Sequence, residues 1–323
     1  MQIPSLPKEG IAPLQYLIKR AMILRMGRSR LYLPKLDSPP ATILDHLIAH
    51  FPNVKAEVWR KRVQEGRVTL ENGTALREDQ AYQQGLTIFY DRETADEPRS
   101  PESENILYQD DEILIADKPH GMPVVPAGDY VERSLLFRLQ RSTGLTDISP
   151  IHRLDRETAG LVLFSVRAGT RGRYHQLFDK QAVEREYLAI AHLPTQLGRK
   201  HWLVENRIEA GTPWFTQRIV EGLPNTKTVI ELLEVHGETG LFRLTPKTGK
   251  KHQLRVHMAS IGAPILGDPF YPQVREKQPG ELSLQLLACR LAFTDPVSGV
   301  PRRFTSTRRL QPPHSAWHPD PRR

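Results

Sequence analysis

The stretch Ile151–Ser165, IHRLDRETAGLVLFS, joins a cluster of charged residues to the start of a hydrophobic strand. The apolar, branched and aromatic run Gly160–Val166 predicts a buried strand. Asp155 precedes it, between Arg153 and Arg156. A carboxylate at the mouth of a buried strand, with neighbouring cations that keep it ionised, is suited to act as a nucleophile. A D-R-E sequence by itself, however, is more often a surface loop with local salt bridges.

Outward from this stretch, strand and helix patterns alternate irregularly. Gly-, Pro- and Asn-rich turns separate the strands where a parallel sheet would need regular crossover helices. The sequence therefore predicts an α+β catalytic domain with a largely antiparallel or mixed β-sheet flanked by helices. The expected strands are Ile106–Tyr108, Ile113–Asp117, Gly160–Val166, Tyr187–Ala191, Lys227–Val235, Gly240–Thr245 and Leu286–Phe293. The expected helices are Tyr174–Lys180 and His252–Ser260, the latter with alternation that leaves a strand possible.

The N-terminal part predicts a separate small α/β domain. Apolar residues at helical spacing indicate a helix over Ala41–Val54, and a second helix is expected over Ala56–Gln64. A strand over Arg67–Leu70 then turns through Asn72-Gly73, a strong two-residue hairpin signal. This order resembles a small RNA-binding module first seen in a small-subunit ribosomal protein.

A cluster of cations lies where the second helix meets this strand. Arg60, Lys61, Arg62 and Arg67 would offer a compact basic face to a phosphate backbone. A solvated helix face is an equally good reading of these residues taken alone.

Composition sets the domain organisation and the class of partner. Between the two predicted domains, residues 91–104 (DRETADEPRSPESE) are acidic and lack hydrophobic periodicity, which indicates a linker. The predicted boundaries are thus 1–90 for the basic N-terminal segment and module, 105–310 for the catalytic domain and 311–323 for a Pro/Arg-rich tail. The 323 residues carry a net charge of +8 and a pI near 9.6, which favours a polyanionic partner such as RNA.

The expected compartment is the cytoplasm. The one cysteine, Cys289, cannot form an internal disulfide, which fits a reducing environment. The apolar N-terminal stretch Ala12–Met26 is interrupted by Lys19, Arg20 and Arg25, so neither a membrane span nor a signal peptide is expected. An Arg-rich organellar transit segment remains an alternative.

Four motifs together resemble the RluA-type pseudouridine synthases, named for the large ribosomal subunit. The first is HRLD followed by T-x-G and an apolar strand. The strongest is the long run KTGKKHQLRVHMASIGAPILGDPFY at Lys247–Tyr271. The other two are EREYLAIA at Glu184–Ala191 and DKPHG at Asp117–Gly121. The resemblance covers roughly Asn105–Phe304 and departs from the family at Ala159, where serine is common, and at Leu287, where histidine is usual.

The resemblance implies a role for each matching residue. Asp155 is expected to be the essential catalytic aspartate, Tyr187 to stack on the target uracil, and Arg255 to pair with Asp155 and hold it in place. Arg153 would enter the RNA stack and help to expel the target uridine, because a planar guanidinium can fill the vacated position. His152, Lys250 and His252 are expected to contact RNA.

The implied reaction is the isomerisation of uridine in RNA to pseudouridine without a cofactor. Ribosomal RNA is the favoured substrate and transfer RNA an alternative, and a monomer suffices. Two rivals remain open: a non-catalytic RNA-binding or ribosome-assembly factor, and a hydrolase that uses Asp155 with Glu157. His252 and His257 have a spacing that metals can use, but no third ligand is evident, so no metal is expected.

Overall fold

The computed structural model describes residues 29–52, 54–91, 103–127, 130–195, 198–278 and 280–311. The chain divides into two compact units. One comprises Met1–Glu97 with Gly128–Glu132, and the other Pro98–Ala127 with Arg133–Arg323. The first 28 residues, most of the predicted linker and nearly all of the predicted tail lie outside the described residues.

The N-terminal unit packs two helices on a small antiparallel sheet of order β1-β3-β2. A capping box starts α2, because Thr42 accepts from the N–H of Asp45 and the Asp45 carboxylate accepts from the N–H of Thr42. Both predicted helices are confirmed, the first shorter than expected at each end. The elements are β1 (Ser29–Tyr32), α2 (Ile43–His50), α3 (Ala56–Gln64), β2 (Val68–Leu70) and β3 (Thr87–Tyr90).

The turn through Asn72-Gly73 differs from the predicted two-residue hairpin. The Leu70 N–H donates to Thr74 O, so three residues form the loop, with Gly73 at a φ of +87°. The returning chain forms an isolated bridge between Thr69 and Ala75, and it is β3, farther along the chain, that pairs along the whole of β2. The hairpin is therefore present where it was predicted, with a loop one residue longer than expected, and the Leu76 N–H of the returning chain donates to Val68 O.

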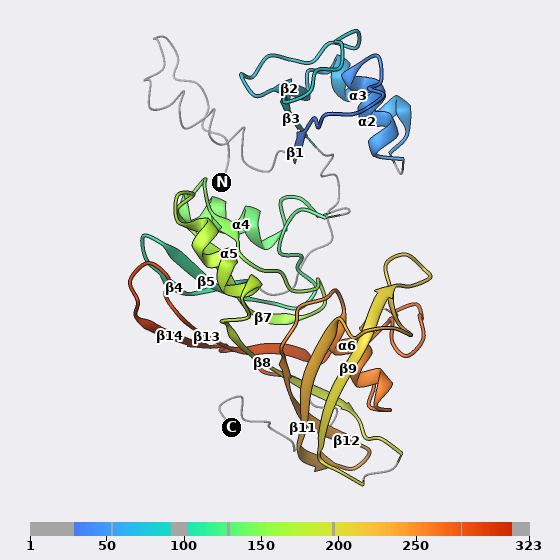
Figure 1. Ribbon diagram of the computed structural model, residues 1–323, viewed down its shortest axis with the longest axis vertical. Helices are drawn as coiled ribbons and strands as arrows, with labels where there is room; N and C mark the ends of the chain where they lie inside the picture. Colours follow the sequence, from blue (N-terminus) through green and yellow to red (C-terminus); the bar gives the residue numbers. More distant parts are fainter. Residues whose placement is uncertain are drawn as a thin grey trace. The chain divides into compact units, whose positions relative to one another are not determined.

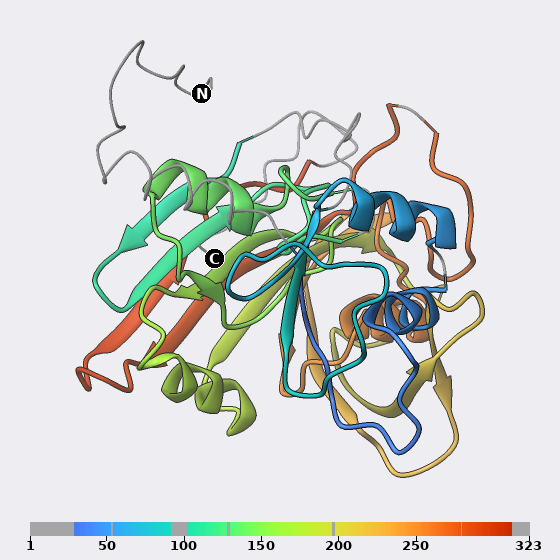
Figure 2. The same ribbon diagram turned by 90° about the horizontal axis from the view of Figure 1, so that it is seen from above.

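The larger unit is built on one extended mixed sheet of order β10-β9-β11-β12-β8-β13-β7-β5-β4, with β14 paired to β13 and β6 to β7 (Figure 1). Among the described strands, β7 and β13 are the one parallel pair. Figure 2 shows the β9–β10 hairpin at one end of this sheet and β4, β5, β13 and β14 at the other. The α+β prediction is confirmed.

The strands of this unit are β4 (Asn105–Gln109), β5 (Ile113–Lys118), β6 (Ser149–Pro150), β7 (Ala159–Ser165), β8 (Glu184–His192), β9 (His201–Ala210), β10 (Gln217–Val220), β11 (Thr226–His236), β12 (Thr239–Pro246), β13 (Leu286–Thr294) and β14 (Pro301–Thr305). Its helices are α4 (Leu135–Thr143), α5 (Arg171–Asp179) and α6 (Gln253–Ser260). Helix α6 confirms the helical alternative for its segment, and α5 begins three residues earlier than predicted.

Successive side chains of a buried strand point to opposite faces of the sheet, so they belong to different core clusters. On β7, Val162 and Phe164 join the cluster that contains residues of α4 and α6, whereas Leu161 and Leu163 join the cluster that contains Tyr174 of α5. Because both faces are covered, β7 is buried along its whole length. This explains why its sequence is continuously apolar.

Gly160 permits a close approach of β7 to β13 beside the Asp155 loop. It has a φ of +113°, and a Cβ there would lie 2.3 Å from the carbonyl oxygen of Ala288. The parallel pairing of Ala288 with Gly160 therefore requires glycine at this position. The glycine of the T-x-G motif is thus explained by backbone packing.

Several elements had no clear signal in the sequence. Helix α4 and strands β9, β10 and β14 are present although no pattern predicted them. Strands β10 and β14 are short and lie beside one neighbour each, so their outward faces are solvated and weakly patterned. Within the described part of the chain, no helix combines the length and the hydropathy needed to cross a membrane.

Candidate active site

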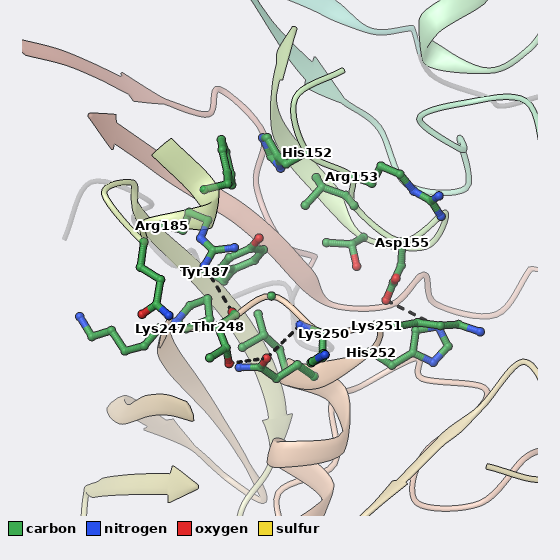
Figure 3. A pocket seen from close by; sticks show the side chains of 18 of the residues that line it. His152, Arg153, Asp155, Arg185, Tyr187, Lys247, Thr248, Lys250, Lys251 and His252 are labelled. Carbon is green, nitrogen blue, oxygen red and sulfur yellow. Dashed lines mark hydrogen bonds and ion pairs between the residues drawn. The ribbon is translucent and has the colours of Figure 1, made fainter. Parts of the chain in front are cut away.

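Three separate segments of the larger unit converge on one cavity of about 740 Å³. Asp155 comes from the loop between β6 and β7, Arg185 and Tyr187 from the start of β8, and residues 247–252 from the turn between β12 and α6. Figure 3 shows Arg185 and Tyr187 on one side of the cavity, with Asp155, Lys251 and His252 on the other. The convergence predicted from the motifs is present.

Asp155 lies within reach of two basic side chains and remains open to the cavity. Its Oδ2 is 3.4 Å from Nη1 of Arg255 and 3.8 Å from Nε2 of His252. The Asp155 side chain is 27% exposed, whereas that of Arg255 is 1% exposed. The expected contact between Asp155 and Arg255 is therefore formed, with the carboxylate accessible to a ligand and its partner sealed in the protein.

Arg255 makes its shorter hydrogen bonds to a second carboxylate, Asp268. Nε donates to Oδ2 at 2.8 Å and Nη2 donates to Oδ1 at 2.6 Å, and both side chains are 1% exposed. This bidentate pair fixes the plane of the guanidinium and leaves Nη1 directed at Asp155. The sequence reading missed Asp268, although the Gly267-Asp268-Pro269-Phe270-Tyr271 run of the strongest motif contains it.

His252 stands at the start of α6 and reaches the loop that carries Asp155. Its φ of +55° is unusual for a residue other than glycine and places the ring between Asp155 and Tyr271. Nδ1 lies 2.9 Å from the Tyr271 hydroxyl, and that oxygen also accepts from the N–H of Gln217. Burial lowers the pKa of His252 to about 4, so the ring is neutral at neutral pH and its contact with Asp155 is no ion pair there.

Tyr187 and Arg185 form the opposite wall. Tyr187 is buried except for 8% of its surface, and burial raises the pKa of its hydroxyl, so it stays a neutral phenol. The Arg185 guanidinium donates to Thr248 O and lies over the ring of Phe178. The His152 ring also stacks on Phe178, with the two ring centroids 4.8 Å apart.

The DKPHG segment, Asp117–Gly121, contacts the backbone of the loop that carries Asp155. Lys118 is fully buried, and its ammonium donates to the carbonyl oxygens of Pro119, Met122 and Arg156. Burial lowers the pKa of Lys118 to about 7. His120 lies beside the next carbonyl, with Nδ1 2.7 Å from Glu157 O, which requires Nδ1 to donate. The motif therefore orients the backbone on the C-terminal side of Asp155.

Gln253 organises the turn on the other side of the cavity. Its Oε1 accepts from the Thr248 hydroxyl and the Lys250 N–H, and its Nε2 donates to Lys227 O and the Thr228 hydroxyl. Every polar atom of this buried amide is satisfied, so the turn is held rigidly against β11. The H-Q of the motif thus has a structural explanation that the sequence did not reveal.

The lining of the cavity is strongly cationic. Six lysine and arginine side chains line it against two aspartates, which suits a polyanionic ligand. Arg153 and Lys250, both predicted to bind RNA, are exposed and belong to this lining. His152 belongs to it as well, but its Nε2 accepts from the Leu163 N–H, which ties the ring to β7. The lining cations are Arg153, Arg185, Lys247, Lys250, Lys251 and Arg255.

The basic cluster of the N-terminal unit is smaller than predicted. Arg62 is 7% exposed, with its guanidinium 4.8 Å from the centre of the Trp59 ring, so it packs in the core and belongs to no surface. The i,i+3 spacing of Trp59 and Arg62 on α3 explains this placement. Arg60 and Lys61 are exposed, and Arg67 is paired with Glu65 at 3.5 Å.

His257 is the second histidine of the spacing that metals can use. His257 is fully buried and its ring nitrogens contact Thr228, Thr226 and Asn206, which is a structural role. Across the ranges that the structure describes, no group of three or more His, Cys, Asp or Glu side chains could hold a metal.

The second carboxylate of the hydrolase alternative is directed elsewhere. Glu157 pairs with Arg156 at 2.7 Å and with Lys277 at 3.9 Å, and it does not line the cavity. A hydrolytic pair of Asp155 and Glu157 therefore has no support in the geometry.

The two departures from the family pattern turn out to be neighbours. Leu287 and Ala159 are register partners in the parallel pairing of β13 with β7. Both are buried in the same apolar cluster.

Comparison with known proteins agrees with this geometry. Residues 112–260, which include Asp155, Tyr187 and Arg255, match the family model described as RNA pseudouridylate synthase. The chain is 30% identical over 221 residues to the dual-specificity RNA pseudouridine synthase RluA of Haemophilus influenzae, a match that covers 62% of this chain and 92% of that protein.

Three further comparisons extend this result. The tRNA pseudouridine(32) synthase, mitochondrial, of Saccharomyces cerevisiae is 26% identical over 71% of this chain, and the match spans 50% of the yeast protein's length. A match to a human relative spans 32% of that protein's length. The solved structure of human RNA pseudouridylate synthase domain containing 1 has the same fold, with a TM-score of 0.54 at 22% identity over 66% of this chain and 86% of that one.

Proposed function

Because the chain belongs to the RNA pseudouridylate synthase family, we propose that it isomerises uridine in RNA to pseudouridine, with Asp155 as the catalytic carboxylate. The observation that carries the proposal is the position of Asp155: it is open to a cationic cavity while Arg255, its partner at 3.4 Å, is sealed behind it. A carboxylate held in this way is oriented and accessible to a nucleotide flipped out of its stack.

The reaction balances without a cofactor. The bond between ribose C1′ and uracil N1 breaks, the uracil turns within the cavity, and C5 forms a new bond to C1′. C5 then loses its proton and N1 gains one, so the product is an isomer of the substrate. Asp155 acts either as a nucleophile at C1′ or as a base that removes a neighbouring ribose proton, and either role needs an ionised carboxylate.

The other side chains of the cavity position the base. Tyr187, neutral and nearly buried, offers a flat surface for the uracil ring, and the cations of the rim neutralise the flanking phosphates. Once RNA fills the cavity, exclusion of water would retain the detached uracil, whose loss would leave an abasic site. Arg153 is exposed at the rim, where it can take the stacking place of the flipped base.

For the RNA substrate we favour ribosomal RNA. This part of the proposal rests on the N-terminal unit, whose two helices, small sheet and exposed Arg60 and Lys61 fit a module for structured RNA. Transfer RNA is the second candidate, because the yeast relative is named for a tRNA position. We also propose that the protein works in the cytoplasm as a monomer.

The catalytic assignment is tested with Asp155→Asn, which keeps the size of the side chain and removes its charge. The purified variant should form no pseudouridine in cellular RNA that carries tritiated uridine, while the unmodified protein does. Asp179→Asn is the matched control, because Asp179 is an exposed carboxylate that lines the same cavity. Product formation by Asp155→Asn at the rate of the unmodified protein would overturn the assignment.

The substrate is identified by mapping pseudouridine in a strain from which the gene has been deleted. Loss of specific sites from ribosomal RNA is the expected result. If sites disappear from transfer RNA and none from ribosomal RNA, the preference for ribosomal RNA is wrong and the catalytic assignment stands.

A further inference from the structure

The loop between β9 and β10 presents an exposed tryptophan next to the cavity. Trp214 is 79% exposed, whereas Trp59 and Trp202 are 1% and 5% exposed. An indole left in water has no stabilising role in the core, and a single exposed ring is too small for an apolar protein interface. Its position beside the candidate active site therefore calls for a ligand that a lone aromatic ring can bind.

The loop that carries Trp214 is ordered by its own hydrogen bonds. Thr216 donates from its N–H and its hydroxyl to Pro213 O, and the Gly211 N–H donates to Thr216 O. The Gln217 N–H donates to the hydroxyl of Tyr271, which also contacts His252. Tyr271 thus links the β9–β10 hairpin to His252, which lines the cavity.

A series of rings leads from Trp214 to the carboxylate of Asp155. The Trp214 ring centroid is 5.8 Å from that of Phe215, which is 5.1 Å from Phe270, which is 5.7 Å from His252. His252 Nε2 lies 3.8 Å from Asp155. Three rings, those of Phe215, Phe270 and His252, thus connect Trp214 to Asp155.

A cation accompanies the exposed ring. Nζ of Lys251 lies 5.8 Å from the centroid of Trp214, and Lys251 also lines the cavity. An exposed aromatic ring with an adjacent lysine is the combination that binds single-stranded nucleic acid, since the ring stacks on a base and the ammonium neutralises its phosphate.

We propose that Trp214 and Lys251 form a stacking platform for an unpaired base of the RNA substrate, next to the nucleotide that enters the cavity. The proposal rests on the proposed function, because it takes RNA to be the substrate. Stacking tolerates any base, so the platform contributes affinity and fixes the path of the strand without reading its sequence. The ligand is therefore an RNA loop or bulge whose bases are already unstacked.

The first test measures binding to a synthetic RNA stem–loop with an all-uridine loop. Trp214→Ala should raise the Kd roughly tenfold or more, and Trp214→Phe should keep it within about threefold of the unmodified protein. Lys251→Gln should reduce the slope of log Kd against log salt by about 1, the value expected for the loss of one phosphate contact. Leu223→Ala, which removes another exposed apolar side chain at 85% exposure, is the control and should bind normally.

The second test locates the stacked base. Abasic residues are placed one at a time along the loop, and each RNA is bound to the unmodified protein and to Trp214→Ala. At one loop position the abasic site should weaken binding to the unmodified protein. At the same position it should cause no further loss of binding to Trp214→Ala, because the stacking contact is already missing there. Equal additional losses at every position would overturn the proposal.

Tryptophan fluorescence gives an independent readout. In a Trp317→Phe background, Trp214 is the exposed tryptophan among the three that remain, so the stem–loop should quench mainly its emission. The quenching should disappear in the further variant Trp214→Phe. Quenching that persists in the Trp214→Phe variant would overturn the platform. So would an unchanged affinity of Trp214→Ala, or failure of the unmodified protein to bind the stem–loop at low salt.

These outcomes are separable from the proposed function. If the unmodified protein converts uridine and Trp214→Ala binds and turns over RNA equally well, the platform is wrong and the synthase assignment stands. If binding depends on Trp214 and the unmodified protein makes no pseudouridine in cellular RNA, the platform stands and the catalytic assignment is wrong.

Discussion

Arg255 donates two hydrogen bonds to Asp268, at 2.8 and 2.6 Å, while its remaining terminal nitrogen lies 3.4 Å from the carboxylate of Asp155. The first carboxylate sets the plane of the guanidinium, and that plane determines where Asp155 is held. Asp268 is buried and does not itself line the cavity, so we expect it to affect the proposed reaction only by positioning Arg255.

The first prediction concerns this pair. Asp268→Asn should lower the free energy of unfolding by about 3 kcal/mol, since it leaves a buried guanidinium without its charged partner. The kcat should fall roughly tenfold or more, while KM for RNA changes little, because a misplaced Asp155 affects the chemical step. Asp110→Asn, which loosens the Arg302 pair in the same unit, is the control for activity and should leave kcat unaltered.

The second prediction concerns Gly160. Gly160→Ala should destabilise the protein by several kcal/mol, because its Cβ would lie 2.3 Å from Ala288 O at a φ of +113°. Thermal unfolding is the measurement. The matched substitution Gly172→Ala, in α5 with no heavy atom within 4 Å of the new Cβ, should be neutral or slightly stabilising. Equal effects of the two changes would show that the contact between β7 and β13 is unimportant.

The third prediction concerns acid. Burial lowers the pKa of both His252 and His257 to about 4, so the unfolded chain binds more protons than the folded chain between about pH 6.5 and pH 4. Stability should therefore be lost as the pH falls through this window, on the order of 3 kcal/mol for each histidine. Urea unfolding as a function of pH measures this. His257→Gln should flatten the loss, and a profile that stays equally steep would contradict the assignment.

The fourth prediction concerns Lys118. Lys118→Met removes the ammonium that binds the carbonyl oxygens of Pro119, Met122 and Arg156, so it should destabilise the protein by about 1–3 kcal/mol. It should also lower kcat more than it raises KM, since Lys118 holds the Asp155 loop and lines no part of the cavity. If KM rises and kcat does not fall, Lys118 acts on RNA binding and the positioning role is wrong.

The fold class could be predicted from local patterns. Branched and aromatic runs indicated the buried strands, and Gly-, Pro- and Asn-rich turns indicated an antiparallel or mixed sheet. These signals depend on periodicity and on residue types within a few positions of one another. The site residues Asp155, Tyr187 and Arg255 were implied by the resemblance of four motifs to a known family, because local patterns alone do not distinguish them from ordinary loop and strand residues.

Contacts between distant segments depend on the tertiary structure. The pairing of β2 with β3 and the position of Trp214 beside Lys251 join segments that no local pattern connects. Arg255 and Asp268 lie in one motif, but the motif does not show that the two side chains share two hydrogen bonds. Arg62 shows the same limit, because its burial against Trp59 depends on the side of α3 that faces the core. Periodicity reports a residue's tendency to be buried, and only packing determines its neighbours.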